Sequence, residues 1–235
     1  MGSEMCIRDS VTAVAAIIQH NTSGIISLKD SGITSPKGME GHSYATWDMP
    51  IEQAIIKKVV TDDGGDYSKI NLISTSVEDI KAALSSNIDS VWIYYAWDGI
   101  ACELQGLDTN FFYFKDYSPE LDDYSPVIIA NNNFLKNNSE VAKKFMAALS
   151  KGYDYAIENP DDAAQILVDA NEGLDIELCK KSQNWLASQY KADADKWGVI
   201  DQKRWDAFYG WVYDNGLCEI DIPDGFGFSN DYLPE

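Results

Sequence analysis

The strongest constraint on the fold is an alternation of short apolar strands with helices over residues 11–130. Residues 90–96 have the clearest strand pattern, and a helix is predicted directly after them, over residues 98–104. The other predicted strands are residues 11–18, 24–28, 42–46, 70–74, 111–114 and 127–130, and the other predicted helices are residues 50–60 and 77–84. Strands separated by helices are typical of βαβ units, so we predict an α/β fold with a mostly parallel sheet.

The pattern changes after residue 131, where helices replace the alternation. These helices are predicted over residues 138–152, 153–158, 160–170, 175–190 and 202–215. Residues 1–10 show no periodicity, and we interpret them as a non-native leader in place of the natural N-terminus. Residues 221–235 are rich in Gly, Pro and Asp, which favours an irregular tail.

The charge of the chain excludes several classes of partner. Acidic residues outnumber basic ones by 38 to 18, which gives a formal charge of −20. Nucleic acids and anionic membranes require the opposite balance, so we expect neither as a partner. The four cysteines form no C-x-x-C pair and only two histidines are present, so we expect no metal site and no cofactor. No apolar run approaches the roughly 20 residues that a membrane span requires.

Several segments carry a resemblance to a known family. The most distinctive are the Trp97-Asp98-Gly99 turn and the Gln-His-Asn-Thr-Ser-Gly sequence of residues 19–24. The full set, in order, is residues 14–24, 35–41, 44–47, 91–99, 126–131 and 145–153. Together they resemble the substrate-binding proteins of ABC importers for pyrimidine precursors of thiamine, a group related to pyrimidine synthase and to sulfonate-binding proteins.

The resemblance implies a type 2 periplasmic binding protein fold, in which two α/β lobes enclose a ligand cleft. It implies that residues 37–123 form the second lobe, and that residues 11–36 and 124–235 form a first lobe that is incomplete at its N-terminal side. It further implies a monomeric carrier, periplasmic or anchored outside the membrane. Such a carrier delivers an aminopyrimidine to a permease and catalyses no reaction.

The chemistry of a flat aminopyrimidine points to particular residues. Its ring needs aromatic faces, and its amine needs an acceptor in the ring plane. We predict Asp98 as that acceptor and Trp97 as a stacking face, because both follow the strand at residues 90–96, and ligands of open α/β sheets bind at strand ends. Tyr95 is predicted to stack on the ligand or to donate from its hydroxyl. Trp47, which follows another strand, is predicted to wall the cleft, and Asn21, in a loop between strands, to hydrogen-bond the ligand.

Four of these site assignments have a structural alternative. Asp98 would instead cap the following helix, Trp97 and Trp47 would pack in a core, and Asn21 would lie in a solvated loop. Trp92 alternates with the site residues along its strand and is predicted to belong to the core.

Two other functions stay open at this point. One is an enzyme of the pyrimidine synthase type that uses pyridoxal phosphate; the absence of a cysteine cluster around Cys102 argues against it. The other is a carrier for a sulfonate or another small anion. The acidic and aromatic character of the predicted site argues against that ligand.

Overall fold

The computed structural model describes residues 11–235, which form two compact units. Unit 1 comprises residues 11–20, Asp123–Ala207 and Ile222–Glu235. Unit 2 comprises Asn21–Asp122 and Phe208–Asp221.

The units divide the chain differently from the predicted lobes. Residues 21–36 lie in unit 2, since the strand they contain pairs with two strands of that unit, and residues 208–221 lie there as well. The assignment of lobes therefore stays a prediction. The predicted leader, residues 1–10, lies outside the described residues.

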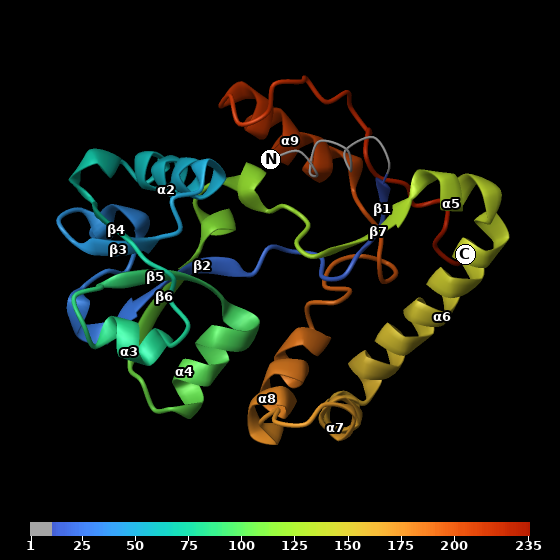
Figure 1. Cartoon of the computed structure of the whole chain (residues 1–235), viewed down its shortest axis with the longest axis horizontal. Coiled ribbons are helices and arrows are strands. Elements are labelled where there is room, and N and C mark those ends of the chain that lie inside the picture. The colour runs from blue at the N-terminus through green and yellow to red at the C-terminus, as the bar shows by residue number, and fades with distance from the viewer. Residues whose placement is uncertain (1–10) are drawn as a thin grey trace. The chain divides into compact units, whose positions relative to one another are not determined.

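Unit 2 is built on a five-stranded sheet with the order β4-β3-β5-β2-β6 (Figure 1). Its strands are β2 (Ser23–Leu28), β3 (Ser43–Thr46), β4 (Asn71–Ser74), β5 (Ser90–Tyr94) and β6 (Thr109–Tyr113). β3 is parallel to β4 and β5, whereas β2 is antiparallel to both β5 and β6. The sheet is therefore mixed and not mostly parallel as predicted, because a hydrophobic pattern marks a strand without marking its direction.

Helices cover both faces of this sheet (Figure 1). α2 (Pro50–Asp62) packs on one face, and α3 (Ile80–Leu84) and α4 (Ile100–Leu104) lie on the other. Neighbouring residues of β2 serve the two faces, since Ile25 belongs to the core cluster on the α2 side and Ile26 to the cluster on the α3 and α4 side.

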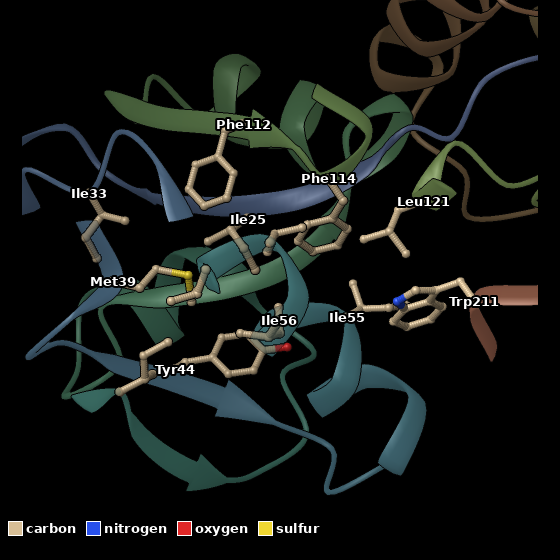
Figure 2. Packing of buried hydrophobic residues seen from close by; sticks show 13 residues of the cluster. Ile25, Ile33, Met39, Tyr44, Ile55, Ile56, Phe112, Phe114, Leu121 and Trp211 are labelled. Atoms are coloured by element: carbon tan, nitrogen blue, oxygen red, sulfur yellow. The ribbon is translucent and has the colours of Figure 1, made fainter. Parts of the chain in front are cut away.

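The cluster on the α2 side forms the largest part of the unit 2 core (Figure 2). Tyr44 of β3, Ile56 of α2 and Phe114 after β6 are all fully or almost fully buried in it. Trp211, from α9 (Gln202–Asp214), packs at the end of the cluster that Ile55 occupies (Figure 2). Side chains far apart in the sequence thus hold the sheet and α2 together.

Unit 1 contains the remaining strands and a run of consecutive helices. β1 (Val11–Ala16) pairs antiparallel with β7 (Val127–Asn131). The helices are α5 (Asn132–Asn137), α6 (Ser139–Glu158), α7 (Pro160–Ala170) and α8 (Ile176–Ala187). The two helices predicted over residues 138–158 are one, because Gly152 lowers helix propensity without breaking the backbone hydrogen bonds.

The unit 1 core packs around Trp197, which is 1% exposed. Its ring stacks on Tyr153 at a centroid distance of 4.1 Å, and its indole nitrogen donates to the Ile17 carbonyl at 3.0 Å. Among residues 11–235, each helix is too short or too polar to cross a lipid bilayer.

An apolar groove of about 330 Å³ opens over β7, α5 and α6 of unit 1. Ile129, Phe134, Val141 and Phe145 line it, and each is between 42% and 58% exposed. Exposed apolar side chains gathered in one groove are uncommon on the surface of monomeric proteins.

Candidate functional site

The five predicted ligand-binding residues all lie at one edge of the unit 2 sheet. β3 and β5 are parallel, so the segments that follow them leave the sheet on the same side. Trp47 follows β3, and residues 95–98 follow β5. β2 runs in the opposite direction and begins there, since its first residue, Ser23, pairs with Tyr94. Asn21, just before β2, therefore lies at the same edge.

Residues Tyr95–Gly99 form a π-helical turn between β5 and α4. The strand predicted through residue 96 thus ends at Tyr94. Turns of this kind are rare and occur often at functional sites, because the extra residue reorients the side chains next to it. This turn carries both Trp97 and Asp98.

Trp97 and Asp98 line the same pocket, which has a volume of about 280 Å³. Trp97 is 42% exposed, so it does not belong to the core. The remaining walls of the pocket come from the segment around α3 and from α4, and they are Glu78, Asp79, Ile80, Lys81, Ala101, Cys102 and Gln105. The pocket therefore combines an aromatic face with carboxylates, one lysine and one amide.

Burial raises the pKa of the Asp98 carboxyl above its usual range, although a hydrogen bond with the Tyr94 backbone works in the other direction. Gly99 is the residue before α4, and no side chain caps that helix, so the alternative role of Asp98 as its cap is wrong. In the same pocket, burial and the nearby carboxylates of Asp98 and Asp79 raise the pKa of the Cys102 thiol to about 11. This thiol is therefore neutral at pH 7 and a weak nucleophile.

Tyr95 supports the turn and is absent from the walls of the pocket. Its hydroxyl donates to the Glu103 carboxylate, and its ring lies 5.0 Å from that of Phe111. A Cβ on Gly99 would lie 2.6 Å from the Tyr95 ring, so only glycine fits beneath it. A stacking role for Tyr95 stays a prediction.

Trp47 lies at the same edge but on the opposite face of the sheet from the pocket. Its ring centroid is 5.5 Å from that of Trp92, which packs against the core cluster on the α2 side. Trp92 also contacts Phe114 at 4.4 Å, which agrees with its predicted place in the core. Trp47 itself is 44% exposed, so its indole is available to a ligand at this edge.

Asn21 is only 6% exposed, so the alternative of a solvated loop is wrong. Its side-chain oxygen accepts hydrogen bonds from the backbone nitrogen of Ser23 at 2.7 Å and from the Ser23 hydroxyl at 2.6 Å. Its own backbone nitrogen donates to Asp122 at 2.9 Å. Asn21 thus shapes the start of β2, and direct ligand contact stays a prediction.

Sequence reasoning missed the polar residues that α3 and α4 contribute. Lys81 and Gln105 line the pocket, yet neither lies near a strand end in the sequence. It also missed Glu52, a buried carboxylate beside the turn over residues 47–49, which joins β3 to α2 and is called the Trp47 turn below. The local signal for Glu52 was incomplete, because a capping box has Ser or Thr three residues before the glutamate and this chain has Met49 there.

Within residues 11–235, no group of three or more His, Cys, Asp or Glu side chains is arranged to hold a metal ion. Cys102, Cys179 and Cys218 are not joined by disulfides.

Comparison with known proteins finds one family and one curated protein that are similar to this chain in sequence. The family described as NMT1/THI5 like matches residues 9–163. A formylaminopyrimidine-binding protein of Halalkalibacterium halodurans is 26% identical over 208 residues, which cover 86% of this chain and 62% of that protein. The chain therefore spans less than two-thirds of the length of this curated relative.

Solved structures confirm the predicted periplasmic binding protein fold. A putative periplasmic sulfonate-binding protein, SsuA of Methylobacillus flagellatus KT, has a TM-score of 0.67 and 16% identity, over 96% of this chain and 68% of that one. The desulfurization enzyme DSZB has a TM-score of 0.63 and 11% identity, over 95% of this chain and 78% of that one. The fold is thus shared by binding proteins and an enzyme, so fold alone does not assign a reaction.

Proposed function

The chain belongs to the NMT1/THI5 like family, and we propose from this that it is the substrate-binding component of an ABC importer for a pyrimidine precursor of thiamine. The name of its formylaminopyrimidine-binding relative supports this ligand class. In this role the protein acts outside the cytoplasm, hands its ligand to a permease and catalyses no reaction.

The observation that carries the proposal is the placement of Trp97 and Asp98 in one pocket. An aminopyrimidine presents a flat ring and an exocyclic amine, which match an indole face and a carboxylate acceptor. The volume of about 280 Å³ suits a ligand with a single ring, since pockets for larger drug-sized ligands start at roughly 300 Å³. Lys81 and Gln105 supply donors for the ring nitrogens or for a formyl oxygen.

The charges around the pocket disfavour a sulfonate or another small anion. Glu78, Asp79 and Asp98 line it with Lys81 as the one basic side chain among its walls. Three carboxylates near one ammonium repel an anion and attract a ligand that carries an amine.

Isothermal titration calorimetry on this chain tests the proposal. The titrants are formylaminopyrimidine, hydroxymethylpyrimidine, taurine and pyridoxal phosphate. We expect the two pyrimidines to bind and Trp97→Ala to weaken them by about tenfold or more, because losing a buried stacking ring costs roughly 1.5–3 kcal/mol.

Phe145→Ala is the matched control, because it removes an exposed aromatic ring from unit 1. Its affinity should equal that of the wild type. Binding of taurine or pyridoxal phosphate without the pyrimidines would refute the proposed ligand, and an unchanged affinity in Trp97→Ala would refute the proposed site.

A further inference from the structure

A buried carboxylate lies directly beneath the Trp47 turn. Glu52 is 2% exposed and accepts hydrogen bonds from the hydroxyls of Tyr44 at 2.5 Å and Thr46 at 3.0 Å. It also accepts from the backbone nitrogens of Trp47, at 3.0 and 3.2 Å, and Met49, at 3.4 Å. Burying a carboxylate is costly unless donors surround it, and here every donor comes from β3 or from the turn between β3 and α2.

The turn that this network holds is exposed and its backbone is strained. Trp47 is 44% exposed and Met49 is 53% exposed. Asp48 between them has a φ of 59°, in the left-handed region that residues other than glycine seldom adopt. Its backbone nitrogen donates to the Thr46 hydroxyl at 3.0 Å, which fixes the turn at a second point.

The indole of Trp47 also has a fixed support, because it packs against a second aromatic ring. Its inner side contacts Trp92 at 5.5 Å with an interplanar angle of 44°, and Trp92 contacts Phe114 at 4.4 Å. The aromatic side chain is therefore supported from the core while nearly half of it faces solvent. Strained backbone that presents exposed side chains in one geometry is typical of binding sites, because preorganisation lowers the entropic cost of binding.

We infer that Glu52 is a positioning residue of the ligand site, which holds Trp47 so that its indole offers the pyrimidine an aromatic face in addition to Trp97. Both indoles lie at the same edge of the unit 2 sheet, Trp97 on the α3 and α4 side and Trp47 on the α2 side, so a flat ring that lies across this edge would contact one indole on each side. Glu52 does not touch the ligand and acts through Trp47. The inference rests on the proposed function, since it adds a contact to the ligand that is proposed for that same site.

A double-mutant cycle separates this role from a general loss of stability. Formylaminopyrimidine is titrated by calorimetry into the wild type, Glu52→Gln, Trp47→Ala and the variant that carries both changes. The amide nitrogen of Gln is a donor, and it would face the hydroxyl and backbone donors that the Glu52 carboxylate now accepts from. Glu52→Gln should therefore weaken binding about five- to tenfold. The double variant should bind no more weakly than Trp47→Ala alone.

Ile56→Val is the control, because Ile56 is buried on the same helix and its hydrocarbon side chain makes no hydrogen bond to the turn. It should lower the melting temperature and leave the affinity unchanged. Unchanged affinity in Glu52→Gln, or losses that add fully in the double variant, would overturn the inference. If Glu52→Gln does not fold, Glu52→Asp takes its place, because it keeps the carboxylate and shortens its reach.

A second measurement does not depend on the ligand. The protein is labelled with 5-fluorotryptophan, and the fluorine signal of Trp47 is assigned by its absence in Trp47→Phe. In Glu52→Gln the Trp47 signal should shift or broaden, while that of Trp197, in the core of unit 1, stays in place. An unchanged Trp47 signal in Glu52→Gln overturns the inference, whatever affinity this variant has for the pyrimidine. Failure of the wild type to bind either pyrimidine refutes the proposed function, and the fluorine spectra then still decide whether Glu52 holds Trp47.

Discussion

Replacing Asp98 by Asn removes a charge from the pocket while keeping the shape of the side chain, and it should make the protein more stable but a weaker binder. Burial raises the pKa of Asp98 above its usual value of 3.8. At a pH between the pKa of the unfolded chain and the raised pKa of the native state, the native state binds more protons than the unfolded chain. The free energy of unfolding therefore falls as the pH rises through this window. The resulting cost is present in full once the pH lies above the raised pKa, and Asp98→Asn removes it.

The effect on binding has the opposite sign. A carboxylate that accepts from the ligand amine contributes roughly 1.5–3 kcal/mol, whereas a neutral amide oxygen contributes roughly 0.5–1.5 kcal/mol. The difference of about 1–1.5 kcal/mol corresponds to an affinity about five- to tenfold weaker. Wild-type affinity should also fall as the pH is lowered toward the pKa of Asp98, and the affinity of Asp98→Asn should depend less on pH.

Two assays check both signs on the same samples. Urea denaturation at pH 7 gives the free energy of unfolding. Calorimetric titration with formylaminopyrimidine between about pH 4 and pH 8, a range that begins near the ordinary carboxyl pKa of roughly 3.9, gives the affinity. Asp30→Asn, an exposed carboxylate of unit 2, is the control and should change neither quantity. A variant at Asp98 that is less stable at pH 7 and binds as tightly as the wild type would refute the reasoning.

Three further changes test the fold. Gly24→Ala would bring a Cβ within 2.0 Å of the Phe112 carbonyl oxygen, so urea denaturation should show a loss of about 1–3 kcal/mol or more; a neutral result would contradict the close approach of β2 and β6. Ile56→Ala empties a fully buried position and should lower the free energy of unfolding by about 2–5 kcal/mol, with a smaller loss if neighbouring side chains close the cavity. Changing Val141 and Phe145 together to Ser in the unit 1 groove should reduce binding of the apolar dye ANS, measured by fluorescence, with a stability change within about 1 kcal/mol; an undiminished dye signal would place the apolar surface elsewhere.

Most elements were predictable because their signals are local. α7 (Pro160–Ala170) begins and ends where the sequence predicts, since Pro160 suits the first turn of a helix and an apolar stripe follows it. α3 is shorter than predicted and begins at Ile80, because Asp79 caps it by accepting from the Ala82 nitrogen at 2.9 Å. Ser76 stands just before the predicted start and does not cap the helix. Both residue types favour this position, so local preference did not decide between them.

The start of α2, the helix after Trp47, was also not decided by local residue preference. Aspartate favours the N-cap position, yet Asp48 does not cap α2: the residue before the helix is Met49, and Asp48 lies in a left-handed turn. Glu52 satisfies the Trp47 and Met49 nitrogens instead. The choice depends on the burial of Glu52 against Tyr44 and Thr46 of β3, which no local pattern encodes.

The sequence by itself determined the positions of the strands and helices and the chemistry carried at strand ends, including Trp97 and Asp98. These features depend on residues within a few positions of one another, through side-chain periodicity and backbone preference. Only the tertiary structure decided that β2 runs against its neighbours, that Lys81 and Gln105 join the Trp97 pocket, and that Trp47 faces the other side of the sheet. Those outcomes depend on packing between segments tens of residues apart, where many pairings bury similar apolar area and only the complete core selects one of them.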